Sequence, residues 1–178
     1  LGLGNMDLEP IKALCRQFSV PYEVITTEIG KILFEARNEA HPCSLCAKLR
    51  KGAFNQAALS LGCNKIAYAH HRDDLIETMF LSLFYEGRFY AFSPRTDLDR
   101  SGLTLIRPLL YVSEAEIKGF SKKYSLPVCK NPCPVDGKTR REFVKNLTAQ
   151  LNREIAGVKD RIFHSIIQGD IEGWPEKQ

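Results

Sequence analysis

The sequence lacks the features that mark membrane and secreted proteins. None of its apolar runs approaches the roughly 18 residues needed to span a bilayer. The start, Leu1 to Met6, has neither a basic stretch nor an apolar core, so we expect no secretory signal and a cytoplasmic protein. Charge of one sign is also scarce, because 25 Lys and Arg against 21 Asp and Glu leave a net charge of only +4. That charge permits a polyanionic partner without requiring one.

What is present is the composition of a globular domain. The chain has 178 residues, of which 44% are hydrophobic and 26% charged, which is enough to bury a core without disulfides. Position 1 is not methionine, and we expect the chain to be a piece of something longer.

Periodic apolar patterns predict helices alternating with strands. Strands are expected at 22–26, 65–69 and 103–107, and helices at 7–18, 29–36, 45–61, 70–86, 113–124, 139–152 and 157–168. The stretch from Gly87 to Gly102 reads as irregular. This alternation is typical of an α/β fold with a mostly parallel sheet.

Six cysteines are sorted by their spacing. Cys15 and Cys63 fall on apolar patterns and are predicted to fill the core. The other four form two close pairs beside prolines in loop-like stretches, Cys43 with Cys46 and Cys129 with Cys133. Two pairs far apart in sequence suit a metal or iron–sulfur site, whose ligands converge from several directions. The Cys-x-x-Cys spacing alone also serves zinc ribbons and thiol redox sites.

The run His70-His71-Arg72-Asp73-Asp74 lies where a predicted strand passes into a helix. In open α/β sheets, ligands bind beyond the carboxyl ends of strands, at such junctions. The two aspartates could simply cap the helix and complement its dipole. Because the five residues together offer a metal or phosphate ligand, a cation and a general base, we favour a functional role.

Three motifs in order resemble a known family. They are Cys-Ser-Leu-Cys-Ala-Lys-Leu-Arg-Lys-Gly (43–52), Ala-His-His-Arg-Asp-Asp (69–74) and Ile-Arg-Pro-Leu (106–109). Together they resemble the PP-loop ATPases of the tRNA 2-thiocytidine synthetase type, with the lysidine synthetases as more distant relatives. The resemblance implies a Rossmann-like α/β ATP pyrophosphatase fold. It also implies adenylation of a tRNA base carbonyl by ATP, followed by sulfur transfer that uses a cysteine-bound [4Fe–4S] cluster.

The resemblance also implies residue roles. Cys43 and Cys46 match the cluster-binding pair, and Cys133 matches the third ligand better than the alternative, Cys129. Three thiolates would leave one iron open, whereas four would favour a structural zinc or a passive cluster. Arg50 is expected to stabilise phosphate charge in catalysis.

The remaining assignments concern the acidic motif and the basic helix start. Asp73 is expected to contact the activated base or a metal, with Asp74 second. The nucleotide-binding residues implied are His70, His71 and Lys51, although Arg50 and Lys51 could equally form a solvated helix face. The residues implied for tRNA contact, which could also be solvated surface, are Lys138, Arg140, Arg141 and Lys145.

The sequence departs from the family in one respect. The glycine-rich loop Ser-Gly-Gly-x-Asp-Ser, which cradles the pyrophosphate of ATP, does not occur in it. We expect that loop upstream of Leu1, and poor ATP affinity for the chain alone. The expected organisation is an incomplete ATP pyrophosphatase-type α/β domain over 1–128, a cysteine loop with helices packing on it over 129–168, and a tail over 169–178.

The implied partners are tRNA, ATP with Mg²⁺ and a sulfur donor such as a cysteine desulfurase; a homodimer is possible. Three other interpretations stay open. The chain could modify another base or substrate, it could be a zinc-stabilised binding module without catalysis, or it could be a thiol-redox enzyme.

Overall fold

A small mixed sheet organises the chain. In the computed structural model, which describes residues 1–3 and 6–169, the strands are β1 (Lys65–Ala67), β2 (Arg95–Leu98) and β3 (Leu103–Ile106). Their order is β1-β3-β2, with β1 parallel to β3 and β2 antiparallel to it. The predicted α/β class is confirmed, the parallel pairing is present in β1–β3, and β2 adds an antiparallel edge.

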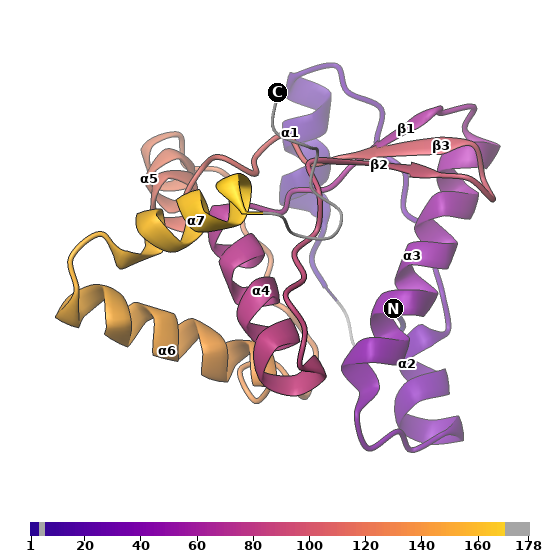
Figure 1. The fold of residues 1–178 in the computed structure, drawn as a ribbon. Helices are drawn as coiled ribbons and strands as arrows, with labels where there is room; N and C mark the ends of the chain where they lie inside the picture. Colours follow the sequence, from indigo (N-terminus) through magenta and orange to yellow (C-terminus); the bar gives the residue numbers. More distant parts are fainter. Residues whose placement is uncertain (4–5, 170–178) are drawn as a thin grey trace.

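Helices stand on two sides of this sheet (Figure 1). Helix α3 packs beside β1 and also contacts α2, whereas α4, α6 and α7 pack on one another beyond the strand ends, on the left of Figure 1. The bounds are α1 (Glu9–Gln17), α2 (Ile29–Lys31), its π-helical continuation η1 (Ile32–Ala36), α3 (Pro42–Ser60), α4 (Arg72–Glu86), α5 (Glu114–Lys123), α6 (Arg140–Glu154) and α7 (Val158–Gln168). Among the residues described, no helix is both long and apolar enough to cross a membrane.

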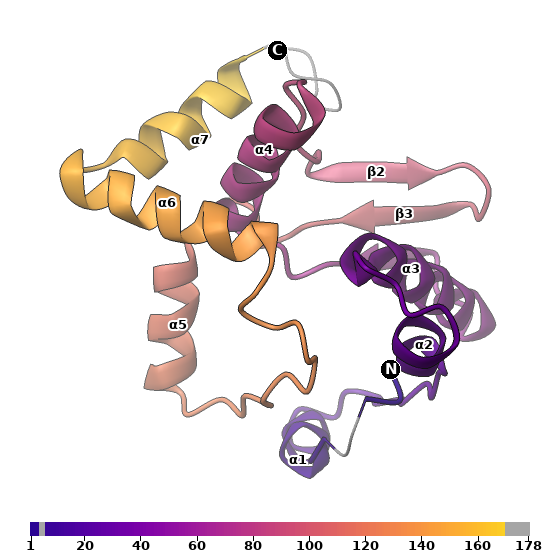
Figure 2. The same ribbon diagram turned by 90° about the horizontal axis from the view of Figure 1, so that it is seen from below.

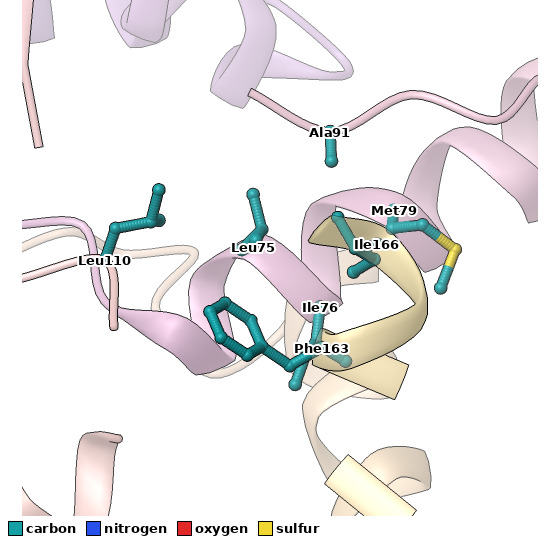
Figure 3. Close-up of a cluster of buried hydrophobic side chains, with 7 residues drawn as sticks. All are labelled: Leu75, Ile76, Met79, Ala91, Leu110, Phe163 and Ile166. Carbon is teal, nitrogen blue, oxygen red and sulfur yellow. The ribbon is translucent and has the colours of Figure 1, made fainter. Parts of the chain in front are cut away.

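The larger core lies between α4 and α7, and Figure 3 shows its side chains pointing toward one another. Burying one such aliphatic side chain stabilises a fold by about 1.5–3 kcal/mol. This cluster therefore fixes α4 from its first turn onward. Its buried members are Leu75, Ile76, Met79, Ala91, Leu110, Phe163 and Ile166. A second cluster joins α3 to the sheet through Ala58, Ile66, Leu103 and Leu105.

Local sequence signals set two of the helix ends. Ser113 and Glu116 form a reciprocal capping box at the start of α5. Gly62 follows the end of α3 with φ of +70°, a conformation that costs a glycine little.

Four local expectations were wrong. Residues 22–26, expected as a strand, lie outside the sheet that the described residues form. Val24 and Ile25 are exposed there. Strand β2 forms within the stretch expected to be irregular, since β3 offers it an antiparallel partner. Cys63 is exposed rather than buried, because β1 begins only at Lys65, whereas Cys15 is half-buried.

The fourth error concerns the start of the helix at the first cysteine pair. Helix α3 begins at Pro42 rather than at 45, so Cys43 lies in the helix together with Cys46. Proline is favoured at a first helical position, where its missing N–H is no loss. The tail expected over 169–178 lies, after Gly169, outside the described residues, and the three-part organisation stays a prediction.

Candidate functional site

The junction between β1 and α4 is closed by a capping box. His71 is the N-cap, and its Nδ1 accepts a hydrogen bond from the Asp74 N–H at 3.3 Å. In return Asp74 Oδ2 accepts from the His71 N–H at 3.0 Å. The capping interpretation therefore holds for Asp74, with histidine where Ser or Thr usually stands. It fixes the backbone of the motif before any ligand binds.

Both carboxylate oxygens of Asp73 accept hydrogen bonds from other residues of the chain. It is 7% exposed, and Oδ1 lies 2.7 Å from the Lys159 ammonium while Oδ2 accepts from the Glu114 N–H at 2.8 Å. Burial would raise the pKa of Asp73, but the bonds from Glu114 and Lys159 outweigh it and leave the pKa lowered. Asp73 thus stays ionised and joins α4, α5 and α7. Sequence reasoning missed Lys159, which has no local motif and is recognised only through the packing of α7.

A second ion pair joins the same two helices. Arg72 Nη1 lies 2.8 Å from Asp160 Oδ1, directly beside the pair between Asp73 and Lys159. Two consecutive residues of α4 therefore pair with two consecutive residues of α7. Each helix supplies one cation and one anion.

Asp74 and Glu77 face Arg141 from α6. The Arg141 guanidinium lies 3.0 Å from Glu77 Oε2 and 3.8 Å from Asp74 Oδ1. Burial raises the pKa of Glu77, Arg141 lowers it in part, and Asp74 adds to the rise. Asp74 is half-buried, so part of its carboxylate remains accessible.

The basic helix start predicted for tRNA contact is therefore partly engaged within the protein. Besides Arg141, Lys145 lies 2.7 Å from Glu114, and Arg140 stacks over the Tyr85 ring at 4.4 Å. Lys138 is exposed.

His70 is held between aromatic rings. Its ring stacks on Phe92 with centroids 4.8 Å apart and meets Tyr68 edge-on at 5.3 Å. Arg107 Nε donates to His70 Nδ1 at 3.3 Å. Burial lowers the pKa of His70, and Arg107 lowers it further although Asp74 opposes this change. The imidazole is therefore neutral, with its proton on Nε2. Arg107 lies in the third sequence motif, which was the signal for it.

A cavity of about 740 Å³ opens beside His70, a size typical of small-ligand sites. Arg50, Lys51, Phe54 and Tyr68 line it together with His70, so three predicted residues meet on its wall. His71 is not among the lining residues, because its ring caps α4 instead. The cavity has an apolar wall from α3 and two cations beside it, which suits an anionic ligand with an apolar or aromatic part.

The first cysteine pair lies on α3, three residues apart on one face of the helix, and Cys133 from the later loop acts electrostatically on Cys46. Burial raises the pKa of the Cys46 thiol, Cys133 and Cys43 raise it further, and Arg50 opposes the change. Cys46 therefore lies near a thiol from the 129–133 segment as well as near Cys43. Cys129 is directed elsewhere, because its thiol donates to the Asp7 carbonyl at 3.2 Å.

The three thiols fit an iron–sulfur or zinc site in donor type. They are not gathered at ligand distances, since among the residues that the structure describes no three Cys, His, Asp or Glu side chains could hold a metal ion. Arg50 lies one helical turn after Cys46 on α3 and lines the cavity, and His70 lines it from the segment before α4. The candidate site therefore comprises the start of α3, the cavity and the junction before α4.

Comparisons with known proteins identify similar sequences and a similar fold. The chain is 39% identical over 150 residues to the tRNA-cytidine(32) 2-sulfurtransferase of Pelobacter propionicus, covering 83% of the chain and 56% of the relative. It is also 39% identical over 168 residues to the same enzyme of Geobacter metallireducens, covering 93% of the chain and 65% of the relative. The chain therefore spans roughly half to two thirds of the length of these relatives.

A solved structure has the same fold. The U34-tRNA thiolase NcsA from Methanococcus maripaludis, solved with its [4Fe–4S] cluster, matches with a TM-score of 0.72 and 21% identity. The match covers 93% of this chain and 57% of that one. The model of the PP-loop domain family matches residues 4–151, which include the six cysteines, the acidic motif and every cavity-lining residue except Leu1. The chain therefore belongs to the PP-loop domain family.

Proposed function

We propose that this chain is the part of an ATP-dependent tRNA sulfurtransferase that binds the sulfur-transferring cofactor and the activated base, and that the product is 2-thiocytidine. The observation that carries the proposal is the placement of Cys43 and Cys46 on one face of α3, one helical turn before Arg50 at the cavity wall. Two relatives that are 39% identical to the chain are named tRNA-cytidine(32) 2-sulfurtransferases, which supports the choice of base.

Cys43, Cys46 and Cys133 would hold a [4Fe–4S] cluster, with Cys129 outside the ligand set. The Cys129 thiol donates a hydrogen bond to the Asp7 carbonyl, whereas Cys133 is the residue of this segment that raises the pKa of Cys46. When bound through three thiolates, such a cluster supplies an iron open to sulfur chemistry. Cys46 must lose its thiol proton when it binds the cluster. Its raised pKa opposes this loss, and the charge of Arg50 favours it.

The cavity residues would act on the nucleotide. Arg50 and Lys51 lie on one helix at the cavity wall, where their charges would stabilise developing phosphate charge. Neutral His70 presents Nε2–H as a donor without adding a charge. ATP, with Mg²⁺, also needs a phosphate cradle of the Ser-Gly-Gly type, and we expect the 178-residue chain to bind ATP weakly by itself.

Asp74 is the better candidate for contact with the activated base. Sequence reasoning favoured Asp73, but both Asp73 oxygens are bonded to Lys159 and Glu114. Asp74 is half-buried and keeps part of its carboxylate accessible. We therefore assign contact to Asp74 and a positioning role to Asp73.

Mass spectrometry of tRNA nucleosides tests the proposal. A strain lacking the gene should contain no 2-thiocytidine, and the wild-type gene should restore it. An Asp74→Asn gene should restore a small fraction, whereas a Lys31→Glu gene, altered on exposed α2, should restore it fully. Unchanged 2-thiocytidine in the deletion strain would exclude the assigned product and favour a different base or substrate.

A further inference from the structure

Helix α5 buries none of its residues completely and exposes two aromatic rings at its end. Phe120 is 58% and Tyr124 55% exposed, and their ring centroids are 4.5 Å apart. Exposed aromatic pairs on a helix that contributes so little to the core usually mark a binding surface. Lys123 Nζ lies 5.3 Å from the Tyr124 ring, so a cation accompanies the pair.

The same segment carries an excess of positive charge. Residues 117–135 contain Lys118, Lys122, Lys123 and Lys130 and no acidic residue, which gives the segment a net charge of +4. A surface that combines excess lysine with exposed rings is complementary to a polyanion that carries aromatic groups.

The other basic segment is less available. In 138–145, Arg141 is paired with Glu77 and Lys145 with Glu114. In α5, by contrast, Lys122 and Lys123 are exposed, and Lys130 is exposed in the loop that follows. Lys118 pairs with Glu114 at 3.0 Å but remains 69% exposed.

We propose that Phe120, Lys122, Lys123, Tyr124 and Lys130, here called the lysine–aromatic surface, bind unpaired nucleotides of RNA. The lysines would contact phosphates and the two rings would stack on bases, a combination that tolerates different base sequences. The choice of tRNA as the RNA rests on the proposed function, whereas the surface itself rests on charge and exposure.

The position of this surface links it to the cysteines. The chain leaves α5 into the loop that carries Cys129 and Cys133, and Figure 2 shows this loop running from α5 toward α1 and back to α6. RNA bound along α5 and Lys130 would lie on the segment that carries Cys133, three residues after Lys130. The surface would thus hold an unpaired loop of the substrate close to the sulfur-transferring site.

Fluorescence anisotropy with tRNA, a single-stranded RNA and a fully paired RNA duplex tests the surface. Lys122→Glu with Lys123→Glu should weaken binding of all three RNAs about tenfold or more, and should lower the salt dependence of log K by about 1–2. Phe120→Ala with Tyr124→Ala should weaken single-stranded RNA about tenfold and leave the duplex within about twofold. The matched controls Lys31→Glu and Phe18→Ala change equally exposed residues elsewhere and should bind as the wild type.

The results separate this proposal from the proposed function. Wild-type affinity in both double variants, or a wild-type chain that binds no RNA, would overturn the surface. A wild-type dimer that the aromatic variant converts to a monomer without change in RNA affinity would also overturn it, because a second copy would then cover the rings. If the variants lose RNA binding while the deletion strain keeps its 2-thiocytidine, the surface stands and the proposed product is wrong.

Discussion

The starts of helices α4 and α3 carry the two halves of the candidate site and are held in opposite ways. At the start of α4, Asp73 bonds on both oxygens and Asp74 closes a capping box. At the start of α3, Cys43 is exposed. Cys133, from another segment, raises the pKa of Cys46. Among the described residues, however, these thiols do not form a group that could hold a metal ion.

This difference follows from the chemistry of the side chains. A buried carboxylate needs hydrogen bonds or a counter-charge, so folding must supply partners for Asp73 and Glu77. A protonated thiol is a small, weakly polar group that needs no partner, so folding leaves the cysteines adjustable. The acidic half is therefore organised by the protein, and the cysteine half would be organised by what it binds.

The largest expected effect is a loss of activity when a cysteine of the proposed cluster site is replaced. Cys133→Ser should reduce 2-thiocytidine formation at least about 100-fold, because loss of a metal ligand removes the cofactor site. Cys129→Ser is the matched control and should stay within about twofold, since its thiol only bonds to the Asp7 carbonyl. Complementation of the deletion strain with each gene measures both values. Equal loss in the two variants would contradict the assignment of Cys133 alone.

The second effect is a loss of stability when the acidic half of the site is altered. Asp73→Asn should lower the free energy of unfolding by about 2–3 kcal/mol, because it leaves Lys159 half-buried without its counter-charge. Asp74→Asn should cost about 0.5–1 kcal/mol, since it weakens the capping box and a partly exposed contact with Arg141 at 3.8 Å. Urea unfolding at pH 7 compares the two variants. A larger loss for Asp74→Asn would reverse the roles assigned here.

The third effect is a pH dependence at His70. Because burial lowers the pKa of His70 in the folded chain, the unfolded chain takes up the proton first as the pH falls through about 6.5. Stability should therefore decrease from pH 7.5 to 5.5, by less than about 1.4 kcal/mol per pH unit, the limit for one proton. His70→Gln should flatten this part of the urea midpoint curve. An unchanged slope would show that another group is responsible.

The smallest effect concerns the outer ion pair between α4 and α7. Asp160→Asn should lower the free energy of unfolding by no more than about 0.5 kcal/mol, because the Asp160 side chain is 65% exposed and water screens the pair. The same urea experiment as for Asp73→Asn provides the comparison. A loss as large as that of Asp73→Asn would mean that the two neighbouring pairs act as one unit.

The sequence predicted those parts of the molecule that local patterns determine. The helix over 157–168 needed only its apolar spacing, and Lys51 and His70, both implied by the family resemblance to bind the nucleotide, line one cavity. The role of Lys159 could not be predicted, because its partner Asp73 lies 86 residues away and meets it through packing of α7. Strand β2 was missed for a related reason, since its pairing with β3 decides its state.

The iron and acid-labile sulfide content of the chain purified without oxygen tests the central claim most directly. With Cys43, Cys46 and Cys133 as ligands, we predict about four irons and four sulfides per chain after reconstitution. The Cys129→Ser variant should give the same values and the Cys133→Ser variant should lose most of both. A colourless protein that holds a single zinc and no sulfide would contradict the account and favour a zinc-stabilised binding module.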